Sequence, residues 1–512
     1  MTKTSGATML PQTSQSYWRD SVELPAFPSL DRDITVDVTV VGGGITGITA
    51  AYLLCKKGLR VALLEADHLL NGTTGHTTAK ISAQHDLIYD ELIHHMGREK
   101  AKLYYEATTS ASRFIENIVR EQSISCQLDS EDAYIYATTD TTARKLEREY
   151  DAYQKLGIEG FLTDTLPFDF SIQRALCMKG QAQFHPLEYL AHLTREIANM
   201  SGQIFEQTVA VDVEDGERPT VVTREGHRVS TNHVLACSHF PFYDGLGFYF
   251  ARMHAERSYV IAAKTDKRYP GGVYVNVDAP YQSLRSVKIG REDAVLIGGG
   301  NHITGQGKDT LTYYEDLATF GQSVFGLRDV LYRWSAQDLV TLDKVAYIGE
   351  ITSGNPSVLV ATGYRKWGMT TGTAAALLLR DIVMNRDNPY RDLYTPSRMY
   401  VDPSLKRFFA QNANVTAHLI KGKFELPLRQ IGDLANGEGD LVTYEGRRAG
   451  AFRDENGVVH LVDTTCTHLG CEVSWNHGDR TWDCPCHGSR FSVDGGVIEG
   501  PAQKPLETLN CH

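Results

Sequence analysis

Four residues near the C-terminus combine two thiols with two imidazoles in a regular spacing. One residue separates Cys466 from His468, and two residues separate Cys484 from His487. Thiolate and imidazole side chains are the ligands that proteins use for transition metals of borderline or soft character. Two short loops that each supply one ligand of each kind therefore predict a metal centre with four protein ligands.

The residues around these ligands distinguish two kinds of centre. Mixed Cys/His tetrads bind structural zinc. They also bind a [2Fe–2S] cluster in which two thiolates hold one iron and two imidazoles hold the other. The stretches 466–471 (CTHLGC) and 484–489 (CPCHGS) bring six ligand-type residues together with Gly470, Gly488 and Ser489, an order that zinc knuckles do not usually have. The motif resembles that of Rieske proteins, and we expect an electron-carrying [2Fe–2S] cluster.

Two further cysteines, Cys471 and Cys486, lie in the same loops. They sit where the Rieske proteins of cytochrome bc-type complexes carry a disulfide that ties the loops over the cluster. The resemblance therefore implies a Cys471–Cys486 disulfide, which would shield the cluster and fix the approach of the two loops.

Length and composition limit what the rest of the chain can be. The protein has 512 residues, which leaves room beside a Rieske domain for a two-domain enzyme. A formal net charge of −12 argues against a nucleic-acid partner. No apolar run approaches the length of a membrane span, and the N-terminus has no signal-peptide core. The cysteines outside the cluster loops are scattered, which favours a reducing, cytoplasmic location.

A second motif lies near the N-terminus. Residues 36–41 form a β-branched run typical of a buried parallel strand, and a G-x-G-x-x-G pattern, a helix and a second strand follow. In this setting Gly42 allows a tight turn, Gly44 lets the backbone approach a pyrophosphate, and Gly47 lets helix and strand pack closely. Glu65 ends the second strand and would accept hydrogen bonds from an adenosine ribose. An ordinary glycine turn is the alternative, but it does not explain this order of elements.

Two other stretches favour FAD over NAD. Residues 71–79 (NGTTGHTTA) are small and hydroxylated and can wrap a pyrophosphate and reach a flavin. A strand at 358–363 that ends in glycine is followed by a small-residue helix whose N-terminus can stabilise negative charge on a reduced flavin. The FAD contacts predicted in these two stretches are Thr73, Thr74, Gly75, His76, Gly363, Gly368, Met369 and Thr370.

With these motifs, residues 37–388 resemble the glycine oxidase/D-amino-acid oxidase superfamily of FAD enzymes. The resemblance implies an α/β, Rossmann-like FAD domain interleaved with an α+β substrate domain and followed by an all-β Rieske domain. The predicted boundaries are an N-terminal extension at 1–35, the FAD domain at 36–86, 184–239 and 334–390, the substrate domain at 87–183 and 240–333, a linker at 391–423, and the Rieske domain at 424–512.

The segment around His76 is similar to the Gly-Thr-Thr-Trp-His-Thr segment of sarcosine and dimethylglycine dehydrogenases. In those enzymes the histidine is joined covalently to the 8α-carbon of the flavin. Here Gly75 stands in place of the tryptophan. Two interpretations stay open, a covalent bond or a histidine that lies beside the cofactor without one, and the departure at Gly75 favours the second.

Enzymes of this superfamily remove a hydride from a carbon beside an amine nitrogen and leave an imine. The resemblance therefore implies an FAD-dependent dehydrogenase for a small amine or amino acid, with Arg257 and Tyr259 as candidate catalytic residues that contact the substrate. Because a Rieske cluster takes one electron at a time, we expect electrons to leave singly to an external one-electron acceptor. A reductase with reversed flow, or a redox sensor without an amine substrate, would use the same parts.

Two other Rieske-containing classes fit the sequence less well. A Rieske oxygenase needs a mononuclear iron site of two histidines and a carboxylate, and the nearest fragment, 91–95, lacks a properly spaced second histidine. Oxygenase loops also lack the extra cysteine pair. A subunit of a cytochrome bc complex would need a membrane anchor.

Overall fold

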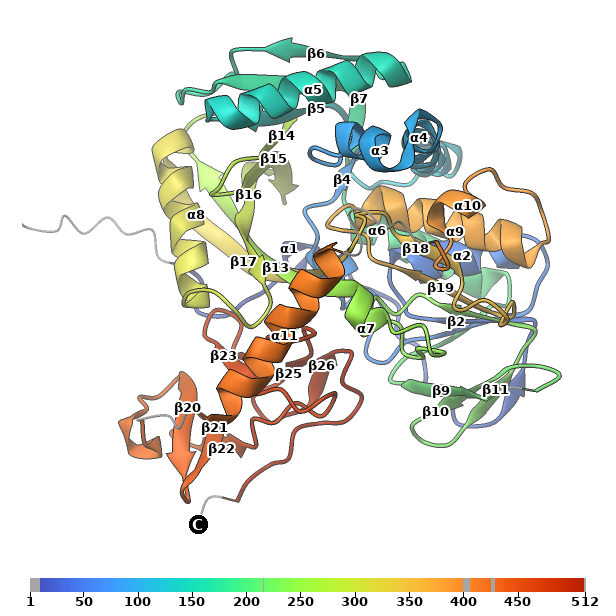
Figure 1. Ribbon diagram of the computed structural model, residues 1–512, viewed down its shortest axis with the longest axis vertical. Helices are drawn as coiled ribbons and strands as arrows, with labels where there is room; N and C mark the ends of the chain where they lie inside the picture. Colours follow the sequence, from blue (N-terminus) through green and yellow to red (C-terminus); the bar gives the residue numbers. More distant parts are fainter. Residues whose placement is uncertain (1–9, 215, 399–405, 425–428, 511–512) are drawn as a thin grey trace, which may run out of the picture.

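The computed structural model describes residues 10–214, 216–398, 406–424 and 429–510. In Figure 1 the FAD domain lies on the right, the substrate domain at the upper left and the Rieske domain at the bottom. Cys511, one of the scattered cysteines, lies outside the described residues.

The FAD domain is built on a six-stranded sheet with the order β18-β19-β12-β2-β3-β8. All neighbouring strands run parallel except β18, which pairs antiparallel with β19. The strands are buried on both faces, as a parallel sheet covered by helices requires. They are β2 (Val38–Val41), β3 (Val61–Leu64), β8 (Gln203–Phe205), β12 (His233–Ala236), β18 (Tyr347–Glu350) and β19 (Val358–Thr362).

Helices and a small second sheet cover the two faces of this sheet. The helices α6 (Pro186–Asn199) and α9 (Gly368–Val383) both pack on α2 (Ile45–Cys55), and α4 (Arg98–Glu121) packs on α9. The second sheet has four strands in the order β1-β11-β10-β9 and lies below the main sheet in Figure 1. Its strands are β1 (Ile34–Thr35), β9 (Ala210–Glu214), β10 (Thr220–Thr223) and β11 (Arg228–Ser230).

The substrate domain is a nine-stranded sheet in which long antiparallel strands dominate. Eight of its strands follow the order β17-β13-β16-β15-β14-β5-β7-β4, and β6 pairs with β7. Their bounds are β4 (Lys80–Ile81), β5 (Asp129–Ala137), β6 (Gly160–Thr163), β7 (Arg174–Gln183), β13 (Met253–Thr265), β14 (Val273–Asn276), β15 (Gln282–Ile289), β16 (Glu292–Ile303) and β17 (Leu327–Thr341). The helices α3 (Tyr89–Met96), α5 (Asp140–Leu156) and α8 (Thr310–Phe325) pack around it, and α1 (Tyr17–Asp20) and α7 (Tyr249–Arg252) are short.

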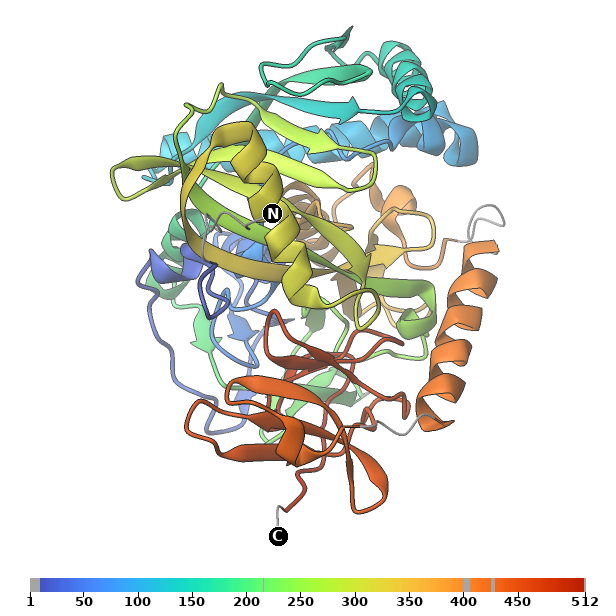
Figure 2. The same ribbon diagram turned by 90° about the vertical axis from the view of Figure 1, so that its left-hand side faces the viewer.

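The Rieske domain consists of two small antiparallel sheets. One contains β20 (Glu438–Tyr444), β21 (Arg447–Arg453) and β22 (Val459–Val462). The other contains β23 (Ser474–Asn476), β24 (Thr481–Asp483), β25 (Arg490–Phe491) and β26 (Val497–Glu499). The Rieske domain also contains the single-turn helix η3 (Ile431–Asp433), and a similar helix, η1 (Thr73–His76), lies in the FAD domain. Figure 2 shows the Rieske strands beneath the long strands of the substrate domain.

The region predicted as a linker contains helices. Residues 399–405 lie outside the described residues, but α10 (Arg391–Tyr394) precedes them and α11 (Lys406–Phe424) follows. The α11 sequence has no proline, and its one glycine, Gly422, lies in the last turn, so nothing interrupts its backbone hydrogen bonds. The helix runs alongside the Rieske domain in Figure 2.

The predicted fold class is confirmed: an α/β domain, a mixed domain and an all-β domain follow the expected order. Among the residues described, no helix is both long and apolar enough to cross a membrane.

Candidate active site and cluster site

A cavity of about 1400 Å³ lies where the three domains meet. The glycine turn between β2 and α2 forms one end of it, with Gly42 and Gly44 in the wall. A Cβ atom on Gly47 would lie 1.9 Å from the carbonyl oxygen of Gly42, whose φ is +111°, so no other residue fits at position 47. The first turn of α2 has no side-chain cap at Gly44. These features fit the pyrophosphate of a dinucleotide, which would lie at this helix N-terminus.

Glu65 follows β3 and lines the cavity, as the motif predicts. Its carboxylate accepts hydrogen bonds from the backbone N–H groups of Gly43 (2.6 Å) and Asp67 (2.9 Å). Burial raises the pKa of this carboxyl group. Glu65 therefore stabilises the glycine turn in addition to the ribose contact that we predict for it.

The segment Thr73–His76 forms the 3₁₀ turn η1, with Thr73, Thr74 and His76 in the cavity wall. Thr74 Oγ1 accepts a hydrogen bond from Ile45 N–H in the first turn of α2 (3.1 Å). A Cβ atom on Gly75 would lie 2.1 Å from the Leu70 carbonyl oxygen, so the tryptophan of the covalent flavoenzymes has no room here. Gly75 itself is buried behind the wall.

His76 lies next to Gly72, whose carbonyl oxygen is 2.9 Å from His76 Nδ1. Burial lowers the pKa of the imidazole, so the ring is neutral at neutral pH and Nδ1 carries the proton that this hydrogen bond needs.

We expect the flavin to be bound without a covalent link to His76, because the Gly75 backbone differs from the covalent motif. Acid precipitation of the wild-type protein should leave yellow FAD in the supernatant. The His76→Ala variant should behave in the same way. A yellow pellet from wild type that turns colourless in His76→Ala would instead establish the covalent bond.

The predicted contacts after β19 divide into two groups. Gly368 and Met369, at the start of α9, line the cavity. Thr370 instead points at the protein interior, where its hydroxyl donates to the Ser82 carbonyl (3.0 Å). Gly363 has a φ of +80°, and a Cβ atom there would lie 2.4 Å from Thr341. These two residues shape the turn into α9 and lie outside the cavity lining.

The structure separates the two predicted substrate contacts. Tyr259 lines the cavity, and its hydroxyl lies 3.0 Å from His302 Nε2. Arg257 is 0 % exposed and lies outside the cavity lining. Its guanidinium group is 3.2 Å from both Asp479 and Glu499 of the Rieske domain. Arg257 thus contacts carboxylates of the protein, and the substrate contact that we expected for it does not fit this placement.

Arg257 differs from its neighbours in β13, because Glu256, Ser258 and Tyr259 line the cavity. The pairing of β13 with β16 is irregular between Arg257 and Tyr259, so the two residues do not share the same surroundings as simple alternation would predict. The sequence reveals neither this irregularity nor that the Rieske domain covers Arg257.

Several residues that line the cavity were not identified from the sequence. Lys80 in β4 is one of them, and burial, followed by the nearby Arg285, lowers its pKa to about 7. Its charge therefore changes near neutral pH. Glu256 is another. Although burial alone would raise it, the pKa of Glu256 is held below its usual value by Lys366, whose Nζ lies 2.9 Å away.

The four predicted cluster ligands lie together in the Rieske domain. Cys466 and Cys484 are 2 % and 1 % exposed. Their thiols share a hydrogen bond, which lowers the pKa of Cys466 and raises that of Cys484. The rings of His468 and His487 are 4.9 Å apart and nearly perpendicular. His468 Nδ1 is buried and has no hydrogen-bond partner in the described part of the chain. Two adjacent thiols and an unpaired ring nitrogen fit a [2Fe–2S] cluster of the Rieske type.

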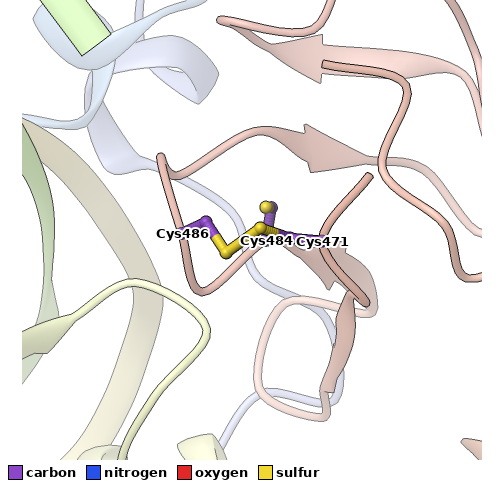
Figure 3. A group of neighbouring side chains, drawn as sticks. All are labelled: Cys471, Cys484 and Cys486. Carbon is purple, nitrogen blue, oxygen red and sulfur yellow. A yellow bond between two sulfur atoms is a disulfide. The ribbon is translucent and has the colours of Figure 1, made fainter. Parts of the chain in front are cut away.

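The structure contains the disulfide between Cys471 and Cys486 (Figure 3). The Cys484 sulfur lies beside it, and ligand atoms of the three residues lie within 4.8 Å of one another. Because two of these sulfurs are bonded to each other, this trio is not a separate metal site. The disulfide instead joins the two loops that carry the ligands.

Phe491 lies at a position from which another side chain could donate a hydrogen bond to the cluster. The resemblance to cytochrome bc-type Rieske proteins matches Ser489 to their serine, and it places Phe491 where they have a tyrosine that donates to a ligand sulfur. In the structure Ser489 hydrogen-bonds to Cys466, and Phe491 is fully buried in β25.

We expect Phe491→Tyr to raise the reduction potential of the cluster, because a new donor would stabilise the more negative reduced state. Protein-film voltammetry would measure the shift. Phe452→Tyr, at a buried position on β21, is the matched control and should leave the potential unchanged. A potential that stays the same or falls in Phe491→Tyr would contradict the expectation.

Comparisons with known proteins agree with both sites. Residues 37–382 match the family model of FAD dependent oxidoreductases (DAO), and residues 425–510 match that of the Rieske [2Fe-2S] domain. YhfW of Bacillus subtilis (strain 168), named as a Rieske 2Fe-2S iron-sulfur protein, is 51% identical over 98% of both chains. Gamma-glutamylputrescine oxidoreductase of Escherichia coli (strain K12) is 21% identical over 73% of this chain and 90% of its own. Glycine oxidase from Geobacillus kaustophilus superimposes with a TM-score of 0.61 at 18% identity, over 71% of this chain and 99% of its own.

Fold and sites define a flavoenzyme that carries an iron–sulfur domain in the same chain. The chain belongs to the DAO family of FAD dependent oxidoreductases, with a C-terminal Rieske domain. Its cofactors are FAD and a [2Fe-2S] cluster, as predicted from the sequence.

Proposed function

We propose that the protein is a dehydrogenase that oxidises a small amine or amino acid and passes the electrons singly from FAD to its Rieske cluster. Enzymes named for oxidation of amino acids and amines are among its structural neighbours and relatives, which supports this substrate class. The external one-electron acceptor would then reoxidise the cluster.

The observation that carries the proposal is a bridge made by Gln337. This residue is 1 % exposed in β17. Its Nε2 donates to the carbonyl of Gly488, the neighbour of the cluster ligand His487 (2.8 Å). The backbone carbonyl of Gln337 accepts a hydrogen bond from Thr73 Oγ1 in the cavity wall (2.9 Å). One buried residue thus connects the cluster loop to the segment that we expect to touch the flavin.

In this proposal the carbon–hydrogen bond beside the substrate nitrogen would break, so that the carbon loses a hydride and the nitrogen loses a proton. The product would be an imine that water hydrolyses. Bound FAD would supply the hydride acceptor, since a flavin can accept an electron pair and release single electrons. Each turnover would therefore consume two equivalents of a one-electron acceptor.

Tyr259 and Lys80 are the residues of the substrate domain that we propose to face the substrate, since both line the cavity. Four buried free cysteines outside the cluster loops, Cys55, Cys126, Cys177 and Cys237, support our further proposal of a cytoplasmic location.

An anaerobic titration with N-methyl and primary amino acids tests the function. A true substrate should bleach the flavin band at about 450 nm, and the EPR signal of the reduced Rieske cluster should then appear. The Cys466→Ala variant is the control, since its flavin should bleach without any Rieske signal. Bleaching by a substrate while the wild-type cluster stays oxidised would refute internal transfer. Failure of every amine to bleach the flavin would favour a redox sensor.

A further inference from the structure

A stretch of the Rieske domain lies along the cavity that the FAD motif forms. Residues 497–503, which we name the covering segment, comprise β26 and the four residues after it, and all of them line the cavity. Gly42, Glu65 and Val209 line the same cavity from the FAD domain. One wall of the dinucleotide site is therefore supplied by the other cofactor domain.

Gln503 attaches the covering segment to the FAD domain. Its side-chain Nε2 donates to the backbone carbonyl of Phe242 (2.8 Å), and its backbone carbonyl accepts a hydrogen bond from Arg224 Nη2 (2.9 Å). The backbone N–H of Arg224 in turn donates to the Val209 carbonyl (2.8 Å). Phe242 and Arg224 come from separate segments that both line the cavity. This one glutamine of the Rieske domain therefore connects the two segments.

The covering segment is equally well fixed on the side of the cluster. The N–H of Ala502 donates to Ser489 Oγ (3.0 Å), and the carbonyl of Ser489 accepts from Cys484 N–H (2.8 Å). Glu499 is held by Arg257 at 3.2 Å and by Arg490 at 3.5 Å. The position of the segment over the cavity is thus coupled to the loop that holds the cluster.

We propose that the covering segment closes over the adenosine half of FAD and retains the cofactor in its groove. The groove beneath it has the features for that half: the turn at Gly42, the carboxylate of Glu65, and the backbone at Val209, directly before β9. FAD then enters or leaves only when the segment lifts away. The proposal depends on the FAD site and is independent of the substrate of the enzyme.

The rate of FAD release from holoprotein tests this proposal. Gln503→Glu replaces the donor to the Phe242 carbonyl with a carboxylate that cannot donate, which detaches the covering segment at this point, so FAD should dissociate at least about tenfold faster. Lys504→Gln is the matched control. It changes the net charge by the same amount at the next, exposed residue, and it should release FAD at the wild-type rate. The rise of free-FAD fluorescence after dilution measures the rates. Equal rates for Gln503→Glu, Lys504→Gln and wild type would overturn the proposal.

Hydrogen exchange of the wild-type protein provides a second, independent measurement. Backbone amides of residues 498–503 should exchange more slowly with FAD bound than in the FAD-free protein, because the bound cofactor holds the segment closed. The β20–β22 sheet serves as the internal reference, since it should exchange alike in both states. Equal exchange of the covering segment with and without FAD would overturn the proposal even if Gln503→Glu failed to fold. The Rieske EPR signal of Gln503→Glu reports whether its C-terminal domain is intact.

Discussion

Gly47→Val should yield protein that purifies without FAD but still shows the Rieske EPR signal. The added Cβ would lie 1.9 Å from the Gly42 carbonyl oxygen and 3.2 Å from Val40. Since both contacts are in the strand, turn and helix that bind the pyrophosphate, the backbone must move away from the geometry that the cofactor needs. The ratio of flavin absorbance at about 450 nm to protein absorbance should fall to the level of flavin-free protein.

Gly432→Val is the matched control, because nothing lies within 4 Å of a Cβ atom at that position in η3. It should retain both cofactors. Glu65→Ala should weaken FAD less than Gly47→Val does, since it removes hydrogen bonds without displacing the backbone. Full flavin occupancy in Gly47→Val would mean that the dinucleotide site is elsewhere.

Cys466→Ala should remove the cluster and leave FAD in place. The loss of one thiolate leaves an iron without a protein ligand, so iron should fall from about two atoms per chain to none. The covering segment is attached through Gln503, Ala502 and Glu499 and not through Cys466, so the FAD groove stays closed. Metal analysis and the EPR spectrum of the reduced protein measure the loss, and the flavin absorbance measures what remains. His487→Ala should give the same result.

Cys126→Ala controls for removal of a buried thiol, since Cys126 is free and 1 % exposed far from the cluster loops in sequence. It should keep about two iron atoms per chain. Zinc in place of iron in the wild-type protein would refute the Rieske assignment. Loss of FAD together with the cluster in Cys466→Ala would show that the loop at 484–489 must be intact for the covering segment to hold its place.

Both cofactors could be predicted from the sequence because their ligands are local. Cys466 and His468 share one loop, and Gly42 to Gly47 share one turn. Such spacings carry the geometry of the site within a few residues, whatever the rest of the fold does. The same holds for Gly75, where a single departure from the covalent motif corresponds to a missing space in the structure.

Features that depend on the docking of distant segments could not be predicted in this way. Arg257 and Glu499 are separated by 242 positions, and neither has a neighbour in sequence that reveals the other. The covering segment shows the same limitation, because nothing in residues 497–503 indicates that they face a dinucleotide. The helices α10 and α11 of the predicted linker were not identified either, since a polar stretch with few breakers forms α11 once it has a surface to run along.

The buried charges around Arg257 have a consequence for how the protein unfolds. Arg257 and Arg490 lie among Asp479, Asp483 and Glu499, and all but Glu499 have side chains less than 10% exposed. Pulling the Rieske domain away would break only the ion pairs of Arg257, which lies in β13 of the substrate domain, because Arg490 and the three carboxylates all belong to the Rieske domain. We therefore expect the Rieske and substrate domains to melt together, and a calorimetric scan should show one cooperative transition for the two.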